Sequence, residues 1–391
     1  MAHVVMCWEL GGDLGHVARM RPLAEALRAR GHRVSFILRE TLAAGRLLDP
    51  VHYSWLQAPL HPELVSPLYS PTLNFTQIMH NVGFHDHNAI VGRMHAWRNL
   101  FDALKPDLLV FDHSPTALLA ARGLPLKRIL LGTGFGIPPA VAPLPPFDAE
   151  TKIQELETSE REIMERINAA LKMFGVERLK RIADIYQADA SLLFTLKELD
   201  HYPQRQDGDY WGPPAQGGGV NAGWPEGEGK RVFAYLKPFK TLPSLLETLA
   251  QAGHSTLIYM SRQDAAQKPS NGKLRYSDRP VDLRQAATES DLIICHAGHG
   301  TVSTALLRGK PLLLLPLNIE QRMLAARVAG MGAGLAAPAL APAGMREKFL
   351  RLLAEPAFTA AARSFAERYA GLEVEKNPEH FAALVEKLLG S

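Results

Sequence analysis

Residues 291–335 constrain the fold more than any other stretch of the chain. They contain a short apolar run at 292–295, a turn that holds Gly298 and Gly300, a helix, and a second apolar run at 312–316. Apolar runs of this length, bounded by turn residues, are typical of buried strands. A strand, a helix and a strand in succession are a unit of doubly wound domains, so this stretch predicts an α/β fold.

The turn in this unit is suited to an anionic ligand. The helix that opens at Thr301 has free amides and partial positive charge at its N-terminus, which suit a diphosphate. His296 ends the first strand and can donate a further hydrogen bond, while Glu320 and Gln321 follow the second strand and can bind sugar hydroxyls. Against this, glycine spacing alone fits any doubly wound domain, in which glycines serve only close packing.

The same alternation opens the chain. Residues 4–8 read as a strand, residues 17–30 as a helix with apolar side chains at helical spacing, and residues 33–38 as the next strand. Further strands at 108–111 and 126–131 alternate with helices. The chain is therefore expected to begin with a parallel-sheet domain.

A stretch rich in Gly and Pro, residues 210–230, predicts an interdomain linker, because the alternation of strands and helices restarts after it. The length of 391 residues suits two cores of ordinary size. We therefore predict one domain over residues 1–215, a second over 216–375, and a closing helix within 376–391.

Composition narrows the class of protein. The formal net charge is +3 at pH 7, which gives no field strong enough to predict binding to nucleic acid. Cys7 and Cys295 both lie in apolar runs, so we expect a reducing, cytoplasmic location rather than a disulfide framework. Residues 1–10 lack the basic flank of a signal peptide, and no run reaches the roughly 18 apolar residues that span a bilayer. Peripheral contact with a membrane stays compatible with this composition.

A second candidate site lies between the first strand and the first helix. Residues 11–16, GGDLGH, come at the carboxyl edge of the predicted sheet, where α/β folds bind ligands. A neutral imidazole at His16 can remove a proton from a hydroxyl, and Asp112, at the end of another predicted strand, can fix its tautomer. His113 competes for either role. Taken singly, His16 reads as a structural donor and Asp112 as a helix cap.

Together these residues resemble the family 1 glycosyltransferases of the GT-B fold. The resemblance is strong over 291–335, where an ordered set of residues is similar to the donor-binding signature of the family: His296, Gly298, Gly300, Pro311, Pro316, Glu320 and Gln321. It is moderate over 4–38, where Gly15 and His16 match a Gly-His after the first strand, and weak over 53–200, apart from Asp112.

The resemblance implies two Rossmann-like, doubly wound α/β domains that face a central cleft, with the helix in 376–391 packed back on the first domain. It also implies inverting transfer of a sugar from a nucleotide-diphosphate donor, a UDP or TDP sugar, to a hydroxyl of a small hydrophobic or lipid acceptor. His16 would deprotonate the acceptor while Asp112 steadies it. No metal and no cofactor is required, since the nucleotide sugar is a co-substrate.

The resemblance divides the donor between two groups of residues. Those implied to hold the diphosphate are His296, Gly298, Gly300 and Thr301, with Lys237 as a point charge. Those implied to hold the sugar are Glu320 and Gln321.

Histidines gather between residues 53 and 97, where the periodicity is weak. His85 and His87 flank Asp86 without the spacing of a zinc motif, and no cysteine is near, so we do not predict a metal site. We predict instead a partly mobile lid of loop and short helix, with His85, His87 and the later His113 in contact with the acceptor.

The chain departs from the family pattern at positions that bind the donor. The usual Asp-Gln pair is Glu320-Gln321 here, so the sugar can differ from glucose. Thr304 stands where the family carries a Glu that binds the ribose, which suggests a deoxyribose nucleotide such as a thymidine donor. No stacking aromatic is evident in 278–283, and Tyr276 is the nearest candidate, so the base stays open.

Two rival functions remain from the sequence. One is a sugar-nucleotide epimerase of the same fold, which the long acceptor region disfavours. The other is a catalytically idle sugar-nucleotide binding protein, which Thr304 and the absence of a glycine turn after residue 236 make conceivable. The sequence does not predict an oligomeric state.

Overall fold

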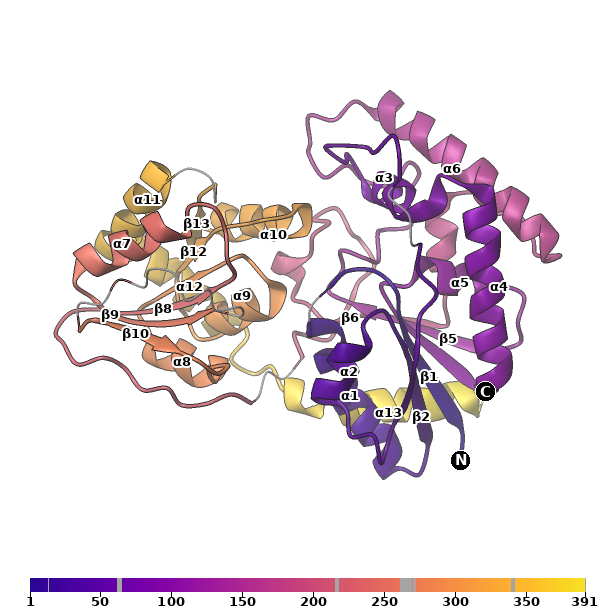
Figure 1. Ribbon diagram of the computed structural model, residues 1–391, viewed down its shortest axis with the longest axis horizontal. Coiled ribbons are helices and arrows are strands. Elements are labelled where there is room, and N and C mark those ends of the chain that lie inside the picture. The colour runs from indigo at the N-terminus through magenta and orange to yellow at the C-terminus, as the bar shows by residue number, and fades with distance from the viewer. Residues whose placement is uncertain are drawn as a thin grey trace. The chain divides into compact units, whose positions relative to one another are not determined.

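The computed structural model describes residues 1–12, 14–61, 65–214, 218–260, 269, 272–338 and 342–390, which divide into two compact units (Figure 1). Unit 1 comprises Met1–Phe194, Tyr202–Gly212 and Val374–Ser391, and unit 2 comprises Thr195–His201 and Pro213–Glu373. The sequence analysis did not anticipate that residues 195–201 belong to unit 2. The stretch predicted as a linker is itself divided between the units.

Unit 1 is built on a seven-stranded parallel sheet with the strand order β3-β2-β1-β4-β5-β6-β7. Its strands are β1 (His3–Trp8), β2 (Arg33–Leu38), β3 (Ser54–Gln57), β4 (Leu108–Asp112), β5 (Lys127–Gly132), β6 (Ala190–Leu193) and β7 (Asp209–Tyr210). The central strands β1 and β4 are buried along their whole length, as expected for a parallel sheet with both faces covered.

The helices of unit 1 are α1 (Gly15–Ala29), α2 (Thr41–Leu47), α3 (Phe75–Met79), α4 (His87–Leu104), α5 (Pro115–Ala121), α6 (Ile153–Met173) and α13 (Asn377–Leu389). Short turns of other helix types occupy His80–Phe84, Ile182–Tyr186 and Val374–Lys376. The last helix, α13, packs against α1, and Phe381 and Val385 join the core on that face of the sheet (Figure 1). Among the helices that the structure describes, none is long and apolar enough to cross a membrane.

Unit 2 has a six-stranded parallel sheet with the order β10-β9-β8-β11-β12-β13. The strands are β8 (Arg231–Leu236), β9 (Ser255–Met260), β10 (Leu274–Ser277), β11 (Leu292–Cys295), β12 (Leu312–Leu314) and β13 (Gly334–Ala336). The helices are α7 (Leu242–Ala252), α8 (Leu283–Glu289), α9 (His299–Leu306), α10 (Ile319–Gly330), α11 (Pro342–Ala354) and α12 (Pro356–Arg368), with a 3-10 turn at Lys197–Leu199.

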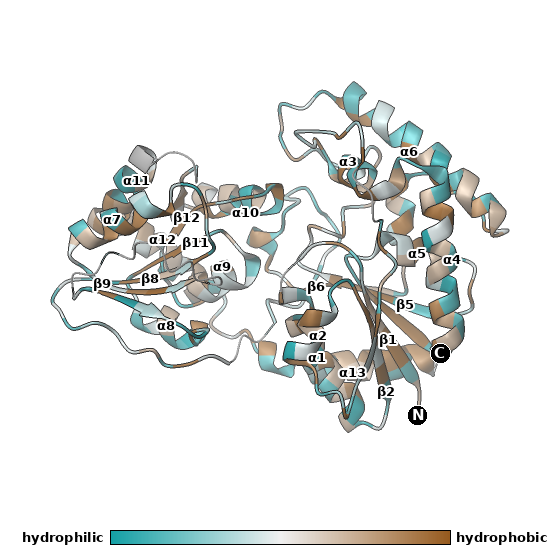
Figure 2. Cartoon of the chain, viewed as in Figure 1, coloured by the Kyte–Doolittle hydropathy of each residue, from teal (hydrophilic) through white to brown (hydrophobic). Residues whose placement is uncertain are grey.

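Alternation along the strands of unit 2 divides its core between the two faces of the sheet. Phe233 and Leu257 pack with α8, α9 and α12, whereas Ala234 and Ile258 pack with α7 and α11. In Figure 2 the strands of both sheets are largely brown, and teal is found mainly on the helices and loops around them. The predicted α/β class and the two parallel-sheet, Rossmann-like domains are confirmed.

The segment predicted as a loose lid is more regular than expected. It contains β3, α3 and the eighteen-residue helix α4, whose first turn is capped by the Asp86 side chain. Ile90, Met94, Trp97 and Phe101 are buried at helical spacing along α4. The interspersed His and Asn residues concealed this periodicity in the sequence. Residues 62–64 of the predicted lid lie outside the described residues.

Candidate active site

His16 and Asp112 come together at the carboxyl edge of the unit 1 sheet. Trp8 of β1 and Asp112 of β4 are partners in register, and both project onto the face covered by α1. His16 is the second residue of α1, and its Nδ1 lies 3.1 Å from Oδ2 of Asp112. The structure therefore brings together the two side chains that the sequence analysis paired.

Arg19 completes this cluster, and the sequence analysis missed it. Its Nη1 lies 3.2 and 3.1 Å from the two carboxylate oxygens of Asp112, and it is largely buried. Burial alone would raise the pKa of Asp112, but the charge of Arg19 and the neighbouring His16 outweigh it, so the pKa lies below its usual value. Arg19 follows His16 by three residues on α1, a spacing that places both on one helix face and was a usable signal.

The ring of His16 is held in a narrow space. Trp8 stacks on it with ring centroids 4.7 Å apart, and the Trp8 indole donates to the carbonyl of Leu10 at 2.7 Å. Gly11 has φ +85°, and a Cβ on it would lie 2.7 Å from Nε2 of His16. Glycine is therefore required at Gly11 both for its backbone conformation and for the space that His16 occupies.

His113 lies beside this pair but differs from it electrostatically. Its ring centroid is 6.1 Å from that of His16, and its φ of 52° is uncommon for a residue with a side chain. Burial, together with the nearby His16, lowers the pKa of His113 to about 3. It therefore stays neutral and is a weak base. Phe75 and Phe135 pack around the His113 ring, at 5.5 and 6.3 Å between centroids.

A second buried ion pair, Glu9 with Arg93, supports the same edge of the sheet. Glu9 follows β1 and is fully buried, and its Oε1 lies 3.3 Å from Nη1 of Arg93 on α4. Its Oε2 accepts from the amides of Thr116 and Ala117 in α5, at 2.9 and 3.3 Å. Burial raises the pKa of Glu9 despite these partners. This pair connects α4 and α5 to the end of β1. No local sequence pattern around either residue predicts it.

His85 and His87 lie in the turn before α4 and at its start. The ring of His85 is 5.6 Å from that of His61 and 5.5 Å from that of His80, measured between centroids. His80 bonds through Nε2 to the carbonyl of Pro67 at 3.1 Å. In the part of the chain that the structure describes, no group of three or more His, Cys, Asp or Glu side chains is arranged to hold a metal ion.

In unit 2, His296 lies at the end of β11 with both ring nitrogens engaged. Its Nδ1 donates to the carbonyl of Leu315 at 2.7 Å, and its Nε2 accepts from the amide of Lys237 at 2.9 Å. Burial lowers the pKa of His296, in keeping with a neutral ring. The expected donation from His296 to a diphosphate therefore has no free ring N–H in this structure. The contacts instead hold the turn after β8 against the ends of β11 and β12.

The helix after this strand begins earlier than predicted. α9 starts at His299 rather than Thr301, with Gly298 as its N-cap residue and no side chain capping it. The first amides of α9, including that of Gly300, are therefore not taken up by a capping side chain, as an anion site needs. Thr304 donates from its hydroxyl to the carbonyl of Gly300 at 2.8 Å.

Glu320 and Gln321 lie in the first turn of α10, just after β12. The Asn318 side chain accepts from the amide of Gln321 at 3.0 Å, and the Gln321 side chain accepts from the amide of Leu317 at 2.7 Å. Gln321 thus helps to cap its own helix, and its NH₂ group remains a donor toward a ligand. Oε1 of Glu320 lies 4.0 Å from Nε2 of His201.

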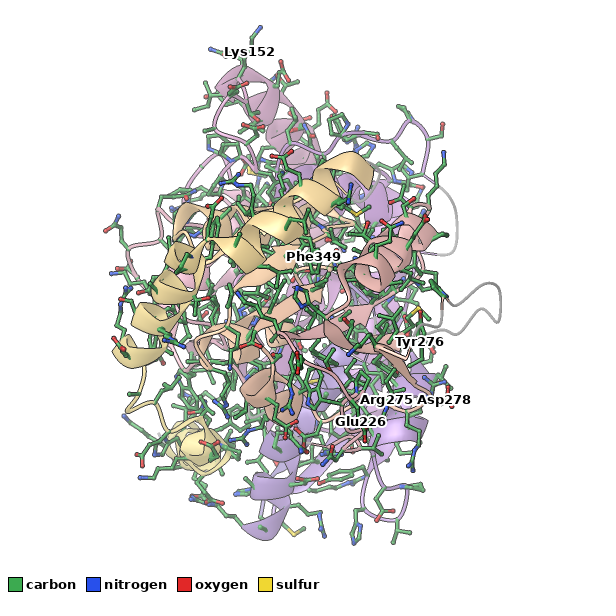
Figure 3. The ribbon with its side chains drawn as sticks, turned by 90° about the vertical axis from the view of Figure 1, so that its left-hand side faces the viewer. Lys152, Glu226, Arg275, Tyr276, Asp278 and Phe349 are labelled. Carbon is green, nitrogen blue, oxygen red and sulfur yellow. The ribbon has the colours of Figure 1, made fainter. Side chains whose placement is uncertain are left out.

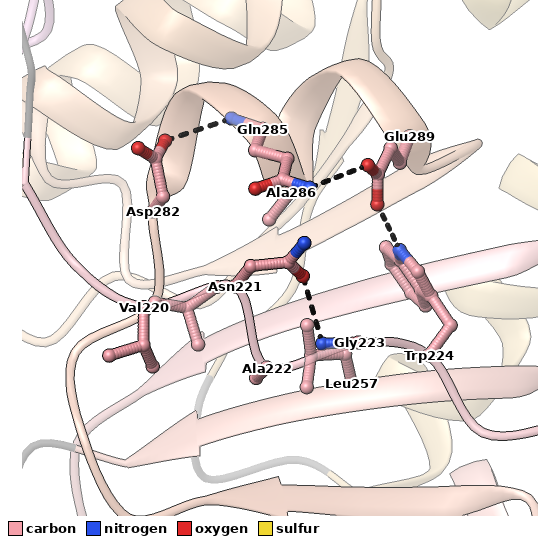
Figure 4. Close-up of a pocket in the computed structure, with 11 residues that line it drawn as sticks. Val220, Asn221, Ala222, Gly223, Trp224, Leu257, Asp282, Gln285, Ala286 and Glu289 are labelled. Carbon is pink, nitrogen blue, oxygen red and sulfur yellow. Dashed lines mark hydrogen bonds between the residues drawn. The ribbon is translucent and has the colours of Figure 1, made fainter.

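A shallow pocket of unit 2 lies away from these residues, between residues 220–224 and α8 (Figure 4). Glu289 there accepts from the Trp224 indole at 2.6 Å and from the Gln285 amide at 2.9 Å (Figure 4). Asn221 accepts from the amide of Gly223 at 3.0 Å. The bond between Trp224 and Glu289 fastens residues 220–224 to α8, so this half of the predicted linker is packed against unit 2.

Comparison with known proteins supports the fold and the signature. Residues 244–384 match the family model described as erythromycin biosynthesis protein CIII-like, C-terminal domain. Over 98 residues the chain is 38% identical to aklavinone 7-beta-L-rhodosaminyltransferase of Streptomyces galilaeus, a match that covers 25% of this chain and only 21% of that protein.

Among solved structures, the chain is similar to glycosyltransferase VinC in complex with dTDP, with a TM-score of 0.69 at 19% identity over 98% of this chain and 100% of that chain. It is also similar to the spinosyn rhamnosyltransferase SpnG, with a TM-score of 0.71 at 18% identity over 100% of both chains. Likeness at this identity establishes architecture. The chain therefore has the GT-B fold, and its signature residues and matched C-terminal region resemble the family 1 glycosyltransferases.

Proposed function

We propose that the chain is an inverting glycosyltransferase, which moves a sugar from a nucleotide-diphosphate donor to a hydroxyl of a small hydrophobic or lipid acceptor. The observation that carries this proposal is the cluster of His16, Asp112 and Arg19 at the carboxyl edge of the unit 1 sheet. A histidine oriented by a buried carboxylate is a general base, and a base that activates a hydroxyl is what such a transfer requires. The scheme assigns no step to a metal or to a cofactor other than the donor, and the reaction is proposed to take place in the cytoplasm.

The proposed step begins in unit 1. With the proton of His16 held on Nδ1 beside Asp112, the lone pair on Nε2 takes the proton of the acceptor hydroxyl. The acceptor oxygen forms a bond to C1 of the sugar from the face opposite the diphosphate. The bond between C1 and the diphosphate oxygen breaks, and its electron pair leaves on the diphosphate. The configuration at C1 is thereby inverted.

The leaving group is assigned to unit 2. The uncapped amides of Gly298 and Gly300 and the dipole of α9 stabilise the charge that develops on the diphosphate. Thr301 and the Lys237 ammonium supply further contacts. Glu320 and Gln321 bind hydroxyls of the sugar. His296 serves this site by positioning the turn at Lys237.

A thymidine diphosphate sugar is the proposed donor. Thr304 has no carboxylate that could bind the two hydroxyls of a ribose. Its own hydroxyl donates a hydrogen bond to the carbonyl of Gly300. VinC is described in complex with dTDP and SpnG in complex with thymidine diphosphate, which supports this choice.

The proposed acceptor is a small hydrophobic molecule or a lipid. SpnG is described in complex with the spinosyn aglycone, which supports a small-molecule acceptor. The neutral His113 orients the hydroxyl, and His85 and His87 contact more distant parts of the acceptor.

The proposal is tested by replacing the base and measuring donor binding separately. In His16→Ala we expect kcat/KM for transfer to fall about 100- to 10,000-fold, while the affinity for dTDP is unchanged, because general-base catalysis contributes this range. His52→Ala is the matched control, since His52 is partly exposed and pairs with Asp49, 2.6 Å away, outside the cluster of His16, Asp112 and Arg19. Transfer that survives in His16→Ala contradicts the assignment. Nucleotide release without any acceptor favours epimerisation or hydrolysis instead.

A further inference from the structure

We propose that Tyr235 and Tyr259 form the surface on which the base of the donor nucleotide stacks; this inference rests on the proposed donor site and assigns one part of it. Tyr235 on β8 and Tyr259 on β9 are partners in register. Their rings are stacked, with centroids 5.2 Å apart and planes 14° from parallel. Tyr235 is 39% exposed and Tyr259 is 8% exposed, so a buried ring supports an accessible one.

The pair lies on the face of the sheet that carries α8 and α9. Tyr235 is also the register partner of Cys295 on β11, and partners in one row of a parallel sheet project to the same face. Cys295 packs in the core formed with α8 and α9. It is followed at once by His296 and the turn into α9, so the two tyrosines occupy the same edge of the sheet as the proposed diphosphate site.

The strand order gives the distance and direction from that site. β8 is the strand beside β11, and β9 is the next one. Neighbouring strands are about 4.8 Å apart, so the pair stands roughly 5 to 10 Å from the end of β11. The sugar moiety of a nucleotide separates its base from its diphosphate by a distance of that order. On the other side of β11, β12 leads to Glu320, so a donor laid across this edge has its base and its transferred sugar at opposite ends.

Tyr276, the candidate that the sequence suggested, is on the wrong face. It is the register partner of Ile258, which belongs to the core under α7 and α11. Phe349 of α11 lies in that same core; Figure 3 labels both Tyr276 and Phe349. The hydroxyl of Tyr276 donates to the carbonyl of Pro269 at 3.2 Å. The period of two residues along β-strands therefore places Tyr276 on the opposite face of the sheet from Tyr235 and Tyr259.

A stacking surface of this kind contributes affinity without reading the base. Every base has a π-face, so stacking on an aromatic side chain tolerates a change of base. We therefore expect the tyrosine pair to increase the affinity of the chain for thymidine diphosphate and for uridine diphosphate by similar amounts. The choice between them then depends on other contacts.

The test measures the affinities of the full chain for dTDP, UDP and inorganic pyrophosphate by titration calorimetry. In Tyr235→Ala both nucleotides should bind about tenfold more weakly or worse, because stacking on an aromatic ring is lost, whereas pyrophosphate should bind as before. Tyr235→Phe should retain nucleotide affinity, since the ring is kept. Tyr276→Ala is the control on the opposite face of the same sheet and should leave all three affinities unchanged.

The outcomes separate this inference from the proposed function. Nucleotide affinity unchanged in Tyr235→Ala, with dTDP still bound by the unaltered chain, overturns the stacking surface and leaves the donor site standing. An equal loss for pyrophosphate also overturns it, because the tyrosine would then act on the diphosphate. Failure of the unaltered chain to bind either nucleotide overturns the donor site and the stacking surface together. A thermal melt of each variant checks that the fold is kept.

Discussion

At the scale of single residues, the unit 1 cluster shows how one carboxylate serves two partners. Asp112 is buried, and it stays ionised only because Arg19 and His16 stand against it. Arg19 contacts both oxygens, which fixes the plane of the carboxylate that faces His16. The orientation of the proposed base thus depends on a residue that contacts no substrate in the scheme.

Arg19→Met is expected to destabilise the chain by about 3 to 5 kcal/mol at neutral pH, since it leaves a buried carboxylate without its cation. The lowered pKa of Asp112 means that its stabilising contribution is present above the pKa of the unfolded state and is lost as the pH falls through the folded pKa. The difference in the free energy of unfolding between the unaltered chain and Arg19→Met should therefore become smaller as the pH is lowered. Urea unfolding at pH 7 and at a series of pH values below 3.8, the ordinary pKa of an Asp, measures it.

The control is Arg21→Met on the same helix. Arg21 is partly exposed and pairs with Glu25 at 3.5 Å, a surface pair of at most about 1 kcal/mol. Equal losses in the two variants would show that Arg19 acts through packing alone, and a deficit independent of pH would exclude its role in keeping Asp112 ionised.

At the scale of elements, α6 is joined to the proline-rich segment after β5 by one buried carboxyl group. Glu160 of α6 accepts from the amide of Leu144 at 2.9 Å and is 6% exposed. Asn74, the N-cap residue of α3, donates to the carbonyl of Leu144 at 3.1 Å. Three elements around the proposed acceptor side therefore meet at Leu144.

Burial raises the pKa of Glu160 to about 6, because the amide bonds offset only part of the cost of removing its charge from water. Its folded pKa is above the unfolded value, so the folded state holds the extra proton between these values and stability falls as the pH rises through that window. Glu160→Gln should therefore gain about 2 kcal/mol relative to the unaltered chain between pH 4.5 and pH 7. Chemical denaturation of both proteins at pH 4.5 and pH 7 measures the difference in their free energies of unfolding. A difference that is the same at both pH values contradicts the raised pKa of Glu160.

At the scale of the whole molecule, the chain returns to unit 1 for its last helix. Phe381 of α13 is fully buried in the core that α1 and β1 share, and Arg30 after α1 pairs with Glu379 and Glu386 at 2.9 and 2.8 Å. The ion pairs are solvent-exposed, so the apolar contact dominates. The first and last helices of the chain thus stabilise one core.

Phe381→Ala is expected to destabilise unit 1 by about 3 to 5 kcal/mol, because it removes a fully buried ring and leaves a cavity. Leu350→Ala is the control, since Leu350 of α11 is 45% exposed and its loss should matter little. Differential scanning calorimetry compares the two. Equal melting temperatures for Phe381→Ala and the unaltered chain would contradict the packing of α13 in this core.

The sequence by itself determined the class of fold and the pairing of two candidate site residues. Apolar periodicity and glycine turns are local properties, so the βα alternation, the parallel sheets and the turn at Gly298 could be read directly. His16 and Asp112 could be paired because parallel strands end at one edge of a sheet. The secondary structure of residues 53–97 could not be predicted in the same way, because the buried apolar residues of α4 are separated by His and Asn.

Only the tertiary structure decided the partners of these side chains. Arg19 reaches Asp112 across 93 positions of the sequence, and the Lys237 amide reaches His296 across 59. Tyr235 meets Tyr259, and Tyr276 is turned away, because strand register and pleat assign each to a face. Local sequence patterns do not predict such pairings, because the pairings form only when strands distant in sequence pack side by side. The electrostatic state of His113 depends on the same packing, because burial lowers its pKa.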